Sequence, residues 1–90
     1  MELKDTTNMM NSKDYKERFI AEYLQVKIRY EKLSSIVNKW DRGKLNFQPT
    51  CPRETYTRQL KFMSNYIGVL EERAVYEDID LSKYNESKGE

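Results

Sequence analysis

Apolar and aromatic side chains recur in a heptad pattern along the first half of the chain. Intervals of four and three residues separate Phe19, Tyr23, Val26, Tyr30, Leu33, Val37 and Trp40. At about 100° per residue these positions stay on one edge of a helix, so the pattern predicts a long helix that packs against a partner of similar length. Asp14, three residues before Glu17, predicts where the helix begins, and Gly43 predicts where it ends.

The second half of the chain carries a matching pattern. The same intervals separate Tyr56, Leu60, Met63, Ile67, Leu70 and Ala74. Pro52 and Glu54 are typical of a helix start. We therefore predict an all-α fold, an antiparallel helical hairpin of two long helices at about residues 14–41 and 52–77.

Each predicted helix also has a second apolar face that points away from the hairpin seam. The first helix presents Ile20, Leu24 and Ile28, and the second presents Phe62, Val69 and Tyr76. A hairpin of two helices buries only one face of each. Exposed apolar patches of this size are rare on soluble monomers, so we expect a homo-oligomeric bundle with these six residues at its interface. A monomer with some solvent-facing hydrophobic residues is the alternative.

The remaining segments complete the predicted domain layout. Residues 1–13 are polar and are expected to form a flexible N-terminal tail. The hairpin domain then covers residues 14–81, in which Ile79 and Leu81 form a short docking segment. Residues 82–90 are expected to form a flexible C-terminal tail.

Two features of the hairpin lead to further structural expectations. Leu45 and Phe47, in the connection between the helices, are expected to plug the open end of the hairpin. Gly68 lies in the middle of the second helix, where glycine costs about 1 kcal/mol relative to alanine. Its presence suggests that another backbone approaches closely at this position.

Composition and charge exclude several classes of function. The chain has 90 residues, enough for one domain, and its net charge of +1 argues against binding to a DNA or RNA duplex. No stretch is apolar enough to suggest a membrane span or a secretion signal, and the one cysteine, Cys51, suits a reducing cytoplasm. Histidine is absent, so nothing activates Cys51 as a nucleophile. We expect no enzyme activity, no metal site and no cofactor.

Polar side chains follow one flank of each predicted helix. Arg18, Glu22, Gln25 and Arg29 lie beside the first seam, and Gln59, Tyr66 and Arg73 lie beside the second. Flanks of the same sense meet when helices pack antiparallel. If Trp40 is level with Tyr56, Arg29 falls near Tyr66 and Glu22 near Arg73.

This edge suits a small ligand that is both anionic and aromatic. Arginine binds phosphate, a tyrosine ring stacks on a base, and amide or carboxylate groups bind base edges. The candidate ligand-binding residues are therefore Arg18, Glu22, Arg29, Gln59, Tyr66 and Arg73. The alternative is a surface ion pair between Glu22 and Arg73, worth about 0 to 1 kcal/mol.

The same residues carry a resemblance to a group of small phage and prophage proteins. Arg18 and Glu22 match an arginine and a glutamate four residues apart in the first helix of that group. The second helix of the group has a Gln-Leu, Met, Tyr, Leu, Arg series, matched here by Gln59-Leu60, Met63, Tyr66, Leu70 and Arg73. The run Thr50-Cys51-Pro52 resembles a subgroup from crAss-like phages, and the whole resemblance covers about residues 14–81.

This group is similar to the helical-hairpin domain of anti-CBASS and anti-Thoeris sponge proteins. Those proteins form hexamers of helical hairpins that sequester cyclic nucleotide or cyclic ADP-ribose signals without cleaving them. The resemblance implies a phage anti-defence protein of the host cytoplasm that binds a small nucleotide messenger and assembles with itself, possibly as a hexamer. The sponges have an aromatic-rich segment before their first helix that residues 1–13 lack, so their ligand contacts are not carried over. The alternative function is a protein-binding inhibitor or adaptor that uses the second apolar faces.

Overall fold

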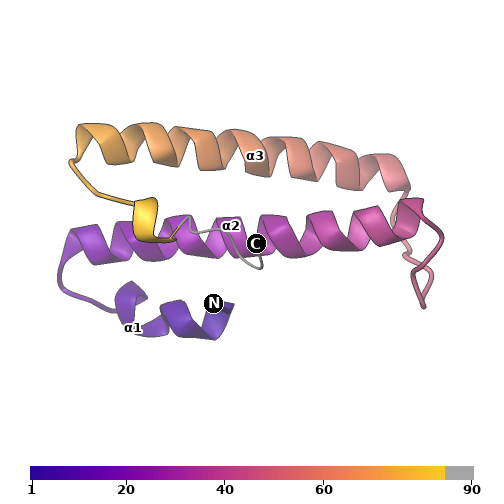
Figure 1. The fold of residues 1–90 in the computed structure, drawn as a ribbon, viewed down its shortest axis with the longest axis horizontal. Helices are drawn as coiled ribbons and strands as arrows, with labels where there is room; N and C mark the ends of the chain where they lie inside the picture. Colours follow the sequence, from indigo (N-terminus) through magenta and orange to yellow (C-terminus); the bar gives the residue numbers. More distant parts are fainter. Residues whose placement is uncertain (85–90) are drawn as a thin grey trace.

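Two long antiparallel helices form the body of the protein (Figure 1). The computed structural model describes residues 1–84, and in them α2 spans Tyr15–Asp41 and α3 spans Arg53–Tyr76. Shorter helices lie at the two ends of the chain, η1 at Leu3–Thr6, α1 at Thr7–Met10 and η2 at Ser82–Tyr84. The described residues contain no strand. The all-α prediction is confirmed, and the observed bounds of the long helices lie within one residue of the predicted ones.

Local hydrogen bonds set both ends of α2. The Asp14 carboxylate accepts a hydrogen bond of 3.0 Å from the backbone N–H of Lys16, as an N-cap residue does. At the other end Gly43 has a φ of 69°, and the N–H of Lys44 donates to the carbonyl of Lys39 at 2.8 Å. This left-handed turn satisfies a carbonyl that the helix leaves open, so the predicted glycine stop is confirmed.

The same kind of turn ends α3, with Asp78 in place of glycine. Asp78 has a φ of 58°, and the N–H of Ile79 donates to the carbonyl of Ala74 at 2.9 Å. The turn sends the chain back toward α2 (Figure 1). Ile79 and Leu81 are buried in the hydrophobic core, which confirms that they dock.

The hydrophobic core is centred on the seam between α2 and α3. Tyr23 and Leu70 are almost inaccessible to solvent. At the loop end the rings of Trp40 and Tyr56 meet edge to face, with their centroids 5.7 Å apart. These two residues are therefore level with each other, which is the register that was assumed for the polar edge.

The prediction that residues 1–13 form a tail is wrong. In the structure η1 and α1 pack against α2 on the side away from α3 (Figure 1). Thr6 is fully buried there, and its hydroxyl donates to the carbonyl of Leu3 at 2.8 Å and accepts from the Gln25 amide at 3.0 Å. Ala21, one helical turn before Gln25 on α2, is also fully buried.

The N-terminal segment (residues 1–13) covers the second apolar face of α2. Leu24 and Ile28 are buried in the core, and Ile20 packs half-buried against it. The chain itself therefore buries Leu24 and Ile28, which were expected at an oligomer interface, while Ile20 stays partly exposed. The chain supplies its own cover, which the sequence pattern did not reveal because residues 1–13 have no apolar periodicity.

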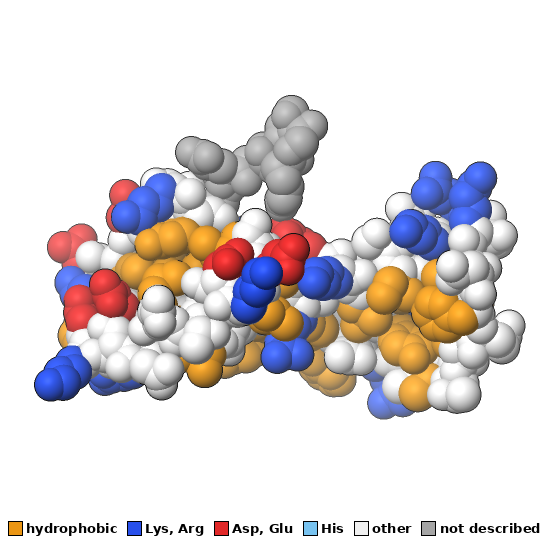
Figure 2. All heavy atoms as spheres, turned by 90° about the horizontal axis from the view of Figure 1, so that it is seen from below, with side chains coloured by type: hydrophobic (Ala, Val, Ile, Leu, Met, Phe, Trp, Pro, Cys, Tyr) orange, Lys and Arg blue, Asp and Glu red, His pale blue; other side chains and the backbone are white. Residues whose placement is uncertain are grey.

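An ion pair between Arg53 and Asp41 links the two helices at the loop end of the hairpin. Both guanidinium contacts from Arg53 to the Asp41 carboxylate are 2.9 Å long, and hydrogen bonding to Arg53 lowers the pKa of Asp41. Leu45 is half-buried but Phe47 is 56% exposed, so the prediction that both residues act as plugs is wrong for Phe47. Hydrophobic side chains accordingly gather at the surface near this end, at the right of Figure 2.

The predicted C-terminal tail is described only in part. Ser82–Tyr84 forms η2, whose last N–H, on Tyr84, donates to the carbonyl of Leu81 at 3.0 Å. The rest of the predicted tail, residues 85–90, lies outside the described residues.

The space around Gly68 is open, in contrast to the prediction from the sequence. A Cβ at Gly68 would meet no atom within 4 Å, so the predicted close approach of another backbone does not occur within this chain.

We expect Gly68→Ala to raise the free energy of unfolding by about 1 kcal/mol, measured by urea denaturation. Gly43→Ala should lower it by roughly 1 to 2 kcal/mol, because alanine is strained at positive φ. Destabilisation by Gly68→Ala would contradict the open environment of this position.

Candidate functional site

The edge between α2 and α3 brings three of the predicted ligand-binding residues together. The Tyr66 hydroxyl of α3 donates a hydrogen bond to the Glu22 carboxylate of α2. Seven residues further along α3, the Arg73 guanidinium lies 4.9 Å from the centroid of the Phe19 ring. The edge therefore carries a phenol, a carboxylate and a cation stacked on an aromatic ring.

The positions of these groups affect the pKa of Tyr66. The hydrogen bond to Glu22 raises the pKa of Tyr66, and partial burial and the Glu22 charge act in the same direction. The positive charge of Arg73 acts against them, which places it within electrostatic range of the phenol. Tyr66 thus keeps its proton at neutral pH and remains a hydrogen-bond donor.

Gln59 lies next to this group on α3. A shallow groove along the helix is lined by Gln59 and Tyr66 together with the side chains of Thr55, Arg58, Phe62 and Met63. An amide, an aromatic ring and an apolar surface therefore share one side of α3. This combination can contact both the polar edge and the flat face of a ring.

The other two predicted residues are placed differently. Arg18 donates from Nη1 to the carbonyl of Ser12 at 2.8 Å, so it ties α2 to the segment before it. Arg29 is exposed, and Tyr66 bonds not to Arg29 but to Glu22, seven residues nearer the start of α2. A phenol gains more by donating to a carboxylate than by facing a solvated guanidinium, which has no acceptor atom.

The surface ion pair weighed as an alternative is not seen. Within residues 1–84 the salt bridge is between Arg53 and Asp41, at the loop end, and not between Glu22 and Arg73. Gln25, which the pattern put on the same flank as Glu22, points to the N-terminal segment and bonds to Thr6.

Sequence reasoning missed a second group of polar side chains. Lys83 and Tyr84, which were assigned to a tail, line a cavity together with Lys27 and Glu31 of α2. The apolar pair Ile79 and Leu81 was the available signal, because a docked segment brings the residues after it to the helix surface.

Two further properties concern the part of the chain that the structure describes. No three side chains of the metal-ligating types are grouped so that they could hold a metal ion. None of the helices combines the length and the apolar character that crossing a membrane requires.

The Glu22–Tyr66 hydrogen bond predicts a specific titration behaviour. Glu22→Gln should lower the pKa of Tyr66 toward its ordinary value of about 10. Any stability gained from the raised pKa is present below pH 10 and is lost as the pH rises through the pKa of the folded state. NMR of 13C-labelled tyrosine rings measures this titration.

Tyr15 provides the matched control. Its hydroxyl donates to Glu77 at 3.0 Å, which raises its pKa in the same way, seven residues before Glu22 along α2. Glu77→Gln should lower the pKa of Tyr15 and leave Tyr66 unchanged. An unchanged Tyr66 titration in Glu22→Gln would show that the two side chains do not bond in solution.

The hairpin matches a known protein family. Residues 13–76 match the family described as Sequestin. No curated protein and no solved structure matches the chain. The matched segment contains all of α2 and α3, including Glu22, Tyr66 and Arg73, and leaves out η1 and α1. Since the match covers most of the chain, this protein belongs to the Sequestin family.

Proposed function

We propose that this chain is a phage anti-defence protein that sequesters a small nucleotide messenger. The ligand class is a cyclic oligonucleotide or a cyclic ADP-ribose-type compound, held without being cleaved. The family name describes a sequestering protein, which supports the binding function. The resemblance to the anti-CBASS and anti-Thoeris sponges supports the ligand class and the anti-defence role. The observation that carries the proposal is the grouping of Glu22, Tyr66 and Arg73 on one edge.

The side chains of this edge suit a nucleotide. Arg73 supplies a cation for a phosphate, and Tyr66, which is 43% exposed, supplies a ring face for a base. Gln59 offers a donor and an acceptor for a base edge, while Glu22 orients the Tyr66 hydroxyl. Arg29 is exposed on the same flank of α2 and adds a second cation. Arg18 takes no part, because it is bonded to Ser12.

Binding without catalysis agrees with the chemistry of the edge. The chain has no histidine to act as a general acid or base near neutral pH. Cys51 is exposed at the loop end, far along the hairpin from Glu22. Sequestration needs only tight, stoichiometric binding, so we propose that the protein is not an enzyme.

The outer face of α3 supports self-association. Phe62, Val69 and Tyr76 are 64%, 52% and 82% exposed, and they follow one another at intervals of seven residues. Because the N-terminal segment already covers the matching face of α2, we propose that copies of the chain assemble through α3. A protein-binding inhibitor is the second candidate function, since the same apolar face can dock on a host protein.

A thermal-shift assay tests the proposed ligand class. The panel consists of cyclic di- and trinucleotides and cyclic ADP-ribose isomers. A messenger at 100 times its Kd should stabilise the fold by about 2.7 kcal/mol, or roughly 10 to 20 °C in Tm. The double variant Tyr66→Ala with Arg73→Ala should lose this shift, whereas Lys61→Ala, an exposed site elsewhere on α3, should keep it. A shift retained by the double variant would exclude this edge, and no shift with any compound would exclude the ligand class.

Light scattering tests the proposed interface. Val69→Lys should reduce the mass in solution, because a buried ammonium opposes association through this face. Val75→Lys is the matched control: Val75 is 77% exposed on another side of α3, and its replacement should leave the mass unchanged. A wild-type monomer would exclude self-association and would favour the host-protein alternative.

A further inference from the structure

The outer face of α3 carries a second heptad pattern. Its residues are all exposed and follow one another at intervals of four, three, four, three and four. At about 100° per residue they stay within roughly 80° of one another, on the opposite side of the helix from the seam with α2. A pattern of this spacing is typical of a helix that packs against another helix. These six residues form the outer stripe: Arg58, Phe62, Asn65, Val69, Glu72 and Tyr76.

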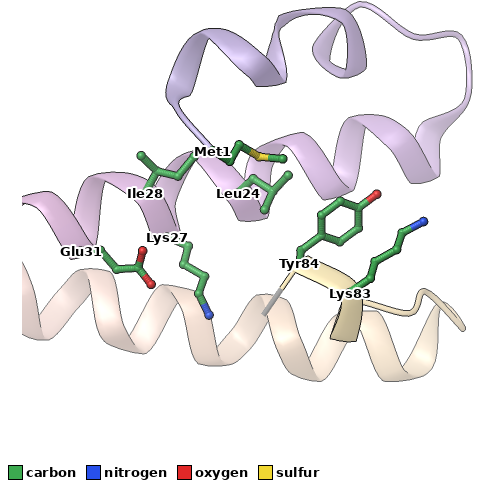
Figure 3. Close-up of a pocket in the computed structure, with 7 residues that line it drawn as sticks. All are labelled: Met1, Leu24, Lys27, Ile28, Glu31, Lys83 and Tyr84. Atoms are coloured by element: carbon green, nitrogen blue, oxygen red, sulfur yellow. The ribbon is translucent and has the colours of Figure 1, made fainter. Parts of the chain in front are cut away.

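The corresponding side of α2 is already covered by the chain itself. Figure 3 shows Met1 of the N-terminal segment and Tyr84 of η2 next to Leu24 and Ile28 of α2. Both of these α2 side chains are buried. The outer stripe, by contrast, is exposed along its whole length, so α3 and not this side of α2 offers a long docking surface.

Opposite charges lie toward the two ends of the outer stripe. Arg58 lies seven residues before Asn65, and Glu72 lies seven residues after it. Within residues 1–84 neither charged side chain takes part in a hydrogen bond or an ion pair. Phe62 and Val69, which are 64% and 52% exposed, lie between them. The stripe therefore presents an apolar centre between a cation and an anion.

The rest of α3 has the same polarity. Bases outnumber acids in its first part, and acids outnumber bases in its last part: Arg53, Arg58 and Lys61 against Glu54, then Glu71 and Glu72 against Arg73. The helix dipole adds partial positive charge at the start of α3 and partial negative charge at its end. Each end of α3 thus attracts the other end of a second α3.

These charges distinguish the two orientations of a second copy. In a parallel pairing Arg58 faces Arg58 and Glu72 faces Glu72, and like charges repel. In an antiparallel pairing with Asn65 near the two-fold axis, Arg58 lies level with Glu72 of the second copy, because both lie about 10.5 Å along the helix from Asn65. The ion pair then forms twice, and Phe62 of each copy is level with Val69 of the other to within about one residue. The charges therefore favour the antiparallel orientation.

We propose that two copies of the chain pair in antiparallel orientation through the outer stripe, with reciprocal ion pairs between Arg58 and Glu72. The partner is a second copy, because the stripe is complementary in charge to its own reverse. This proposal rests on the self-association in the proposed function, to which it adds the orientation and the contacts. A two-fold contact closes on itself, so it gives a dimer and not an open filament. Any larger assembly is then built from these dimers.

Disulfide cross-linking in a Cys51→Ser background tests the orientation. A mixture of the Arg58→Cys and Glu72→Cys variants should form a mixed disulfide dimer under mild oxidation, identified by intact mass spectrometry. Each variant alone should cross-link far less, because identical positions lie about 21 Å apart along an antiparallel pair and a disulfide needs Cα atoms within about 7 Å. Cross-linking of Arg58→Cys with itself would show a parallel pairing, and the absence of a mixed dimer would show another interface. Either result overturns the proposal.

Charge reversal tests the ion pairs. Arg58→Glu and Glu72→Arg should each raise the Kd of the dimer about tenfold, measured by sedimentation, and combining them in one chain should return it to within about threefold of the wild type. The matched control is Lys39→Glu, the same change of charge at an exposed site on α2, which should leave the Kd unchanged. A combined variant as weak as the single variants would contradict the pairing of Arg58 with Glu72.

The same measurements separate this proposal from the proposed function. If Val69→Lys reduces the mass in solution but the mixture of cysteine variants does not cross-link, self-association through α3 stands and the antiparallel pairing is wrong. If the wild-type protein is a monomer, this proposal and the proposed self-association both fail. Messenger binding is decided separately, by the thermal-shift assay.

Discussion

Burial of α2 on two sides is the constraint on which the rest of this structure depends. The helix is apolar on the edge that carries Tyr23 and also on the face that carries Leu24 and Ile28. α3 covers the edge, and the N-terminal segment covers much of the face. Burial of a leucine-sized side chain contributes roughly 1.5 to 3 kcal/mol, so the short terminal segments have a sufficient reason to order on α2.

This arrangement makes the two long helices unequal. α2 is the central element, with α3 on one side and the N-terminal segment on the other, whereas α3 is packed on one side only (Figure 1). Phe62 and Tyr76 consequently remain exposed, while Leu24, in an equivalent second face, is buried. The asymmetry leaves the outer face of α3 exposed, and the Glu22–Tyr66 edge lies beside it.

The Glu22–Tyr66 edge combines a fixed polar group with an apolar surface. The carboxylate of Glu22 holds the Tyr66 hydroxyl, so this hydroxyl is an ordered donor. The groove beside it on α3, lined among others by Phe62 and Met63, adds the apolar surface.

The sequence by itself determined the two long helices of the hairpin. Heptad spacing and local signals such as Asp14 and Gly43 depend on neighbours within a few residues, so they predicted both helices, whereas the level pairing of Trp40 with Tyr56 was assumed and the tertiary structure supplied it. They also placed Tyr66 and Arg73 on one edge with Glu22. Only the tertiary structure decided that Tyr66 bonds to Glu22 and not to Arg29, because the lengths and charges of opposing side chains select the partner. It alone showed that Thr6 anchors the N-terminal segment and that Tyr84 returns to α2, since both depend on contacts between residues distant in the sequence, which periodicity does not encode.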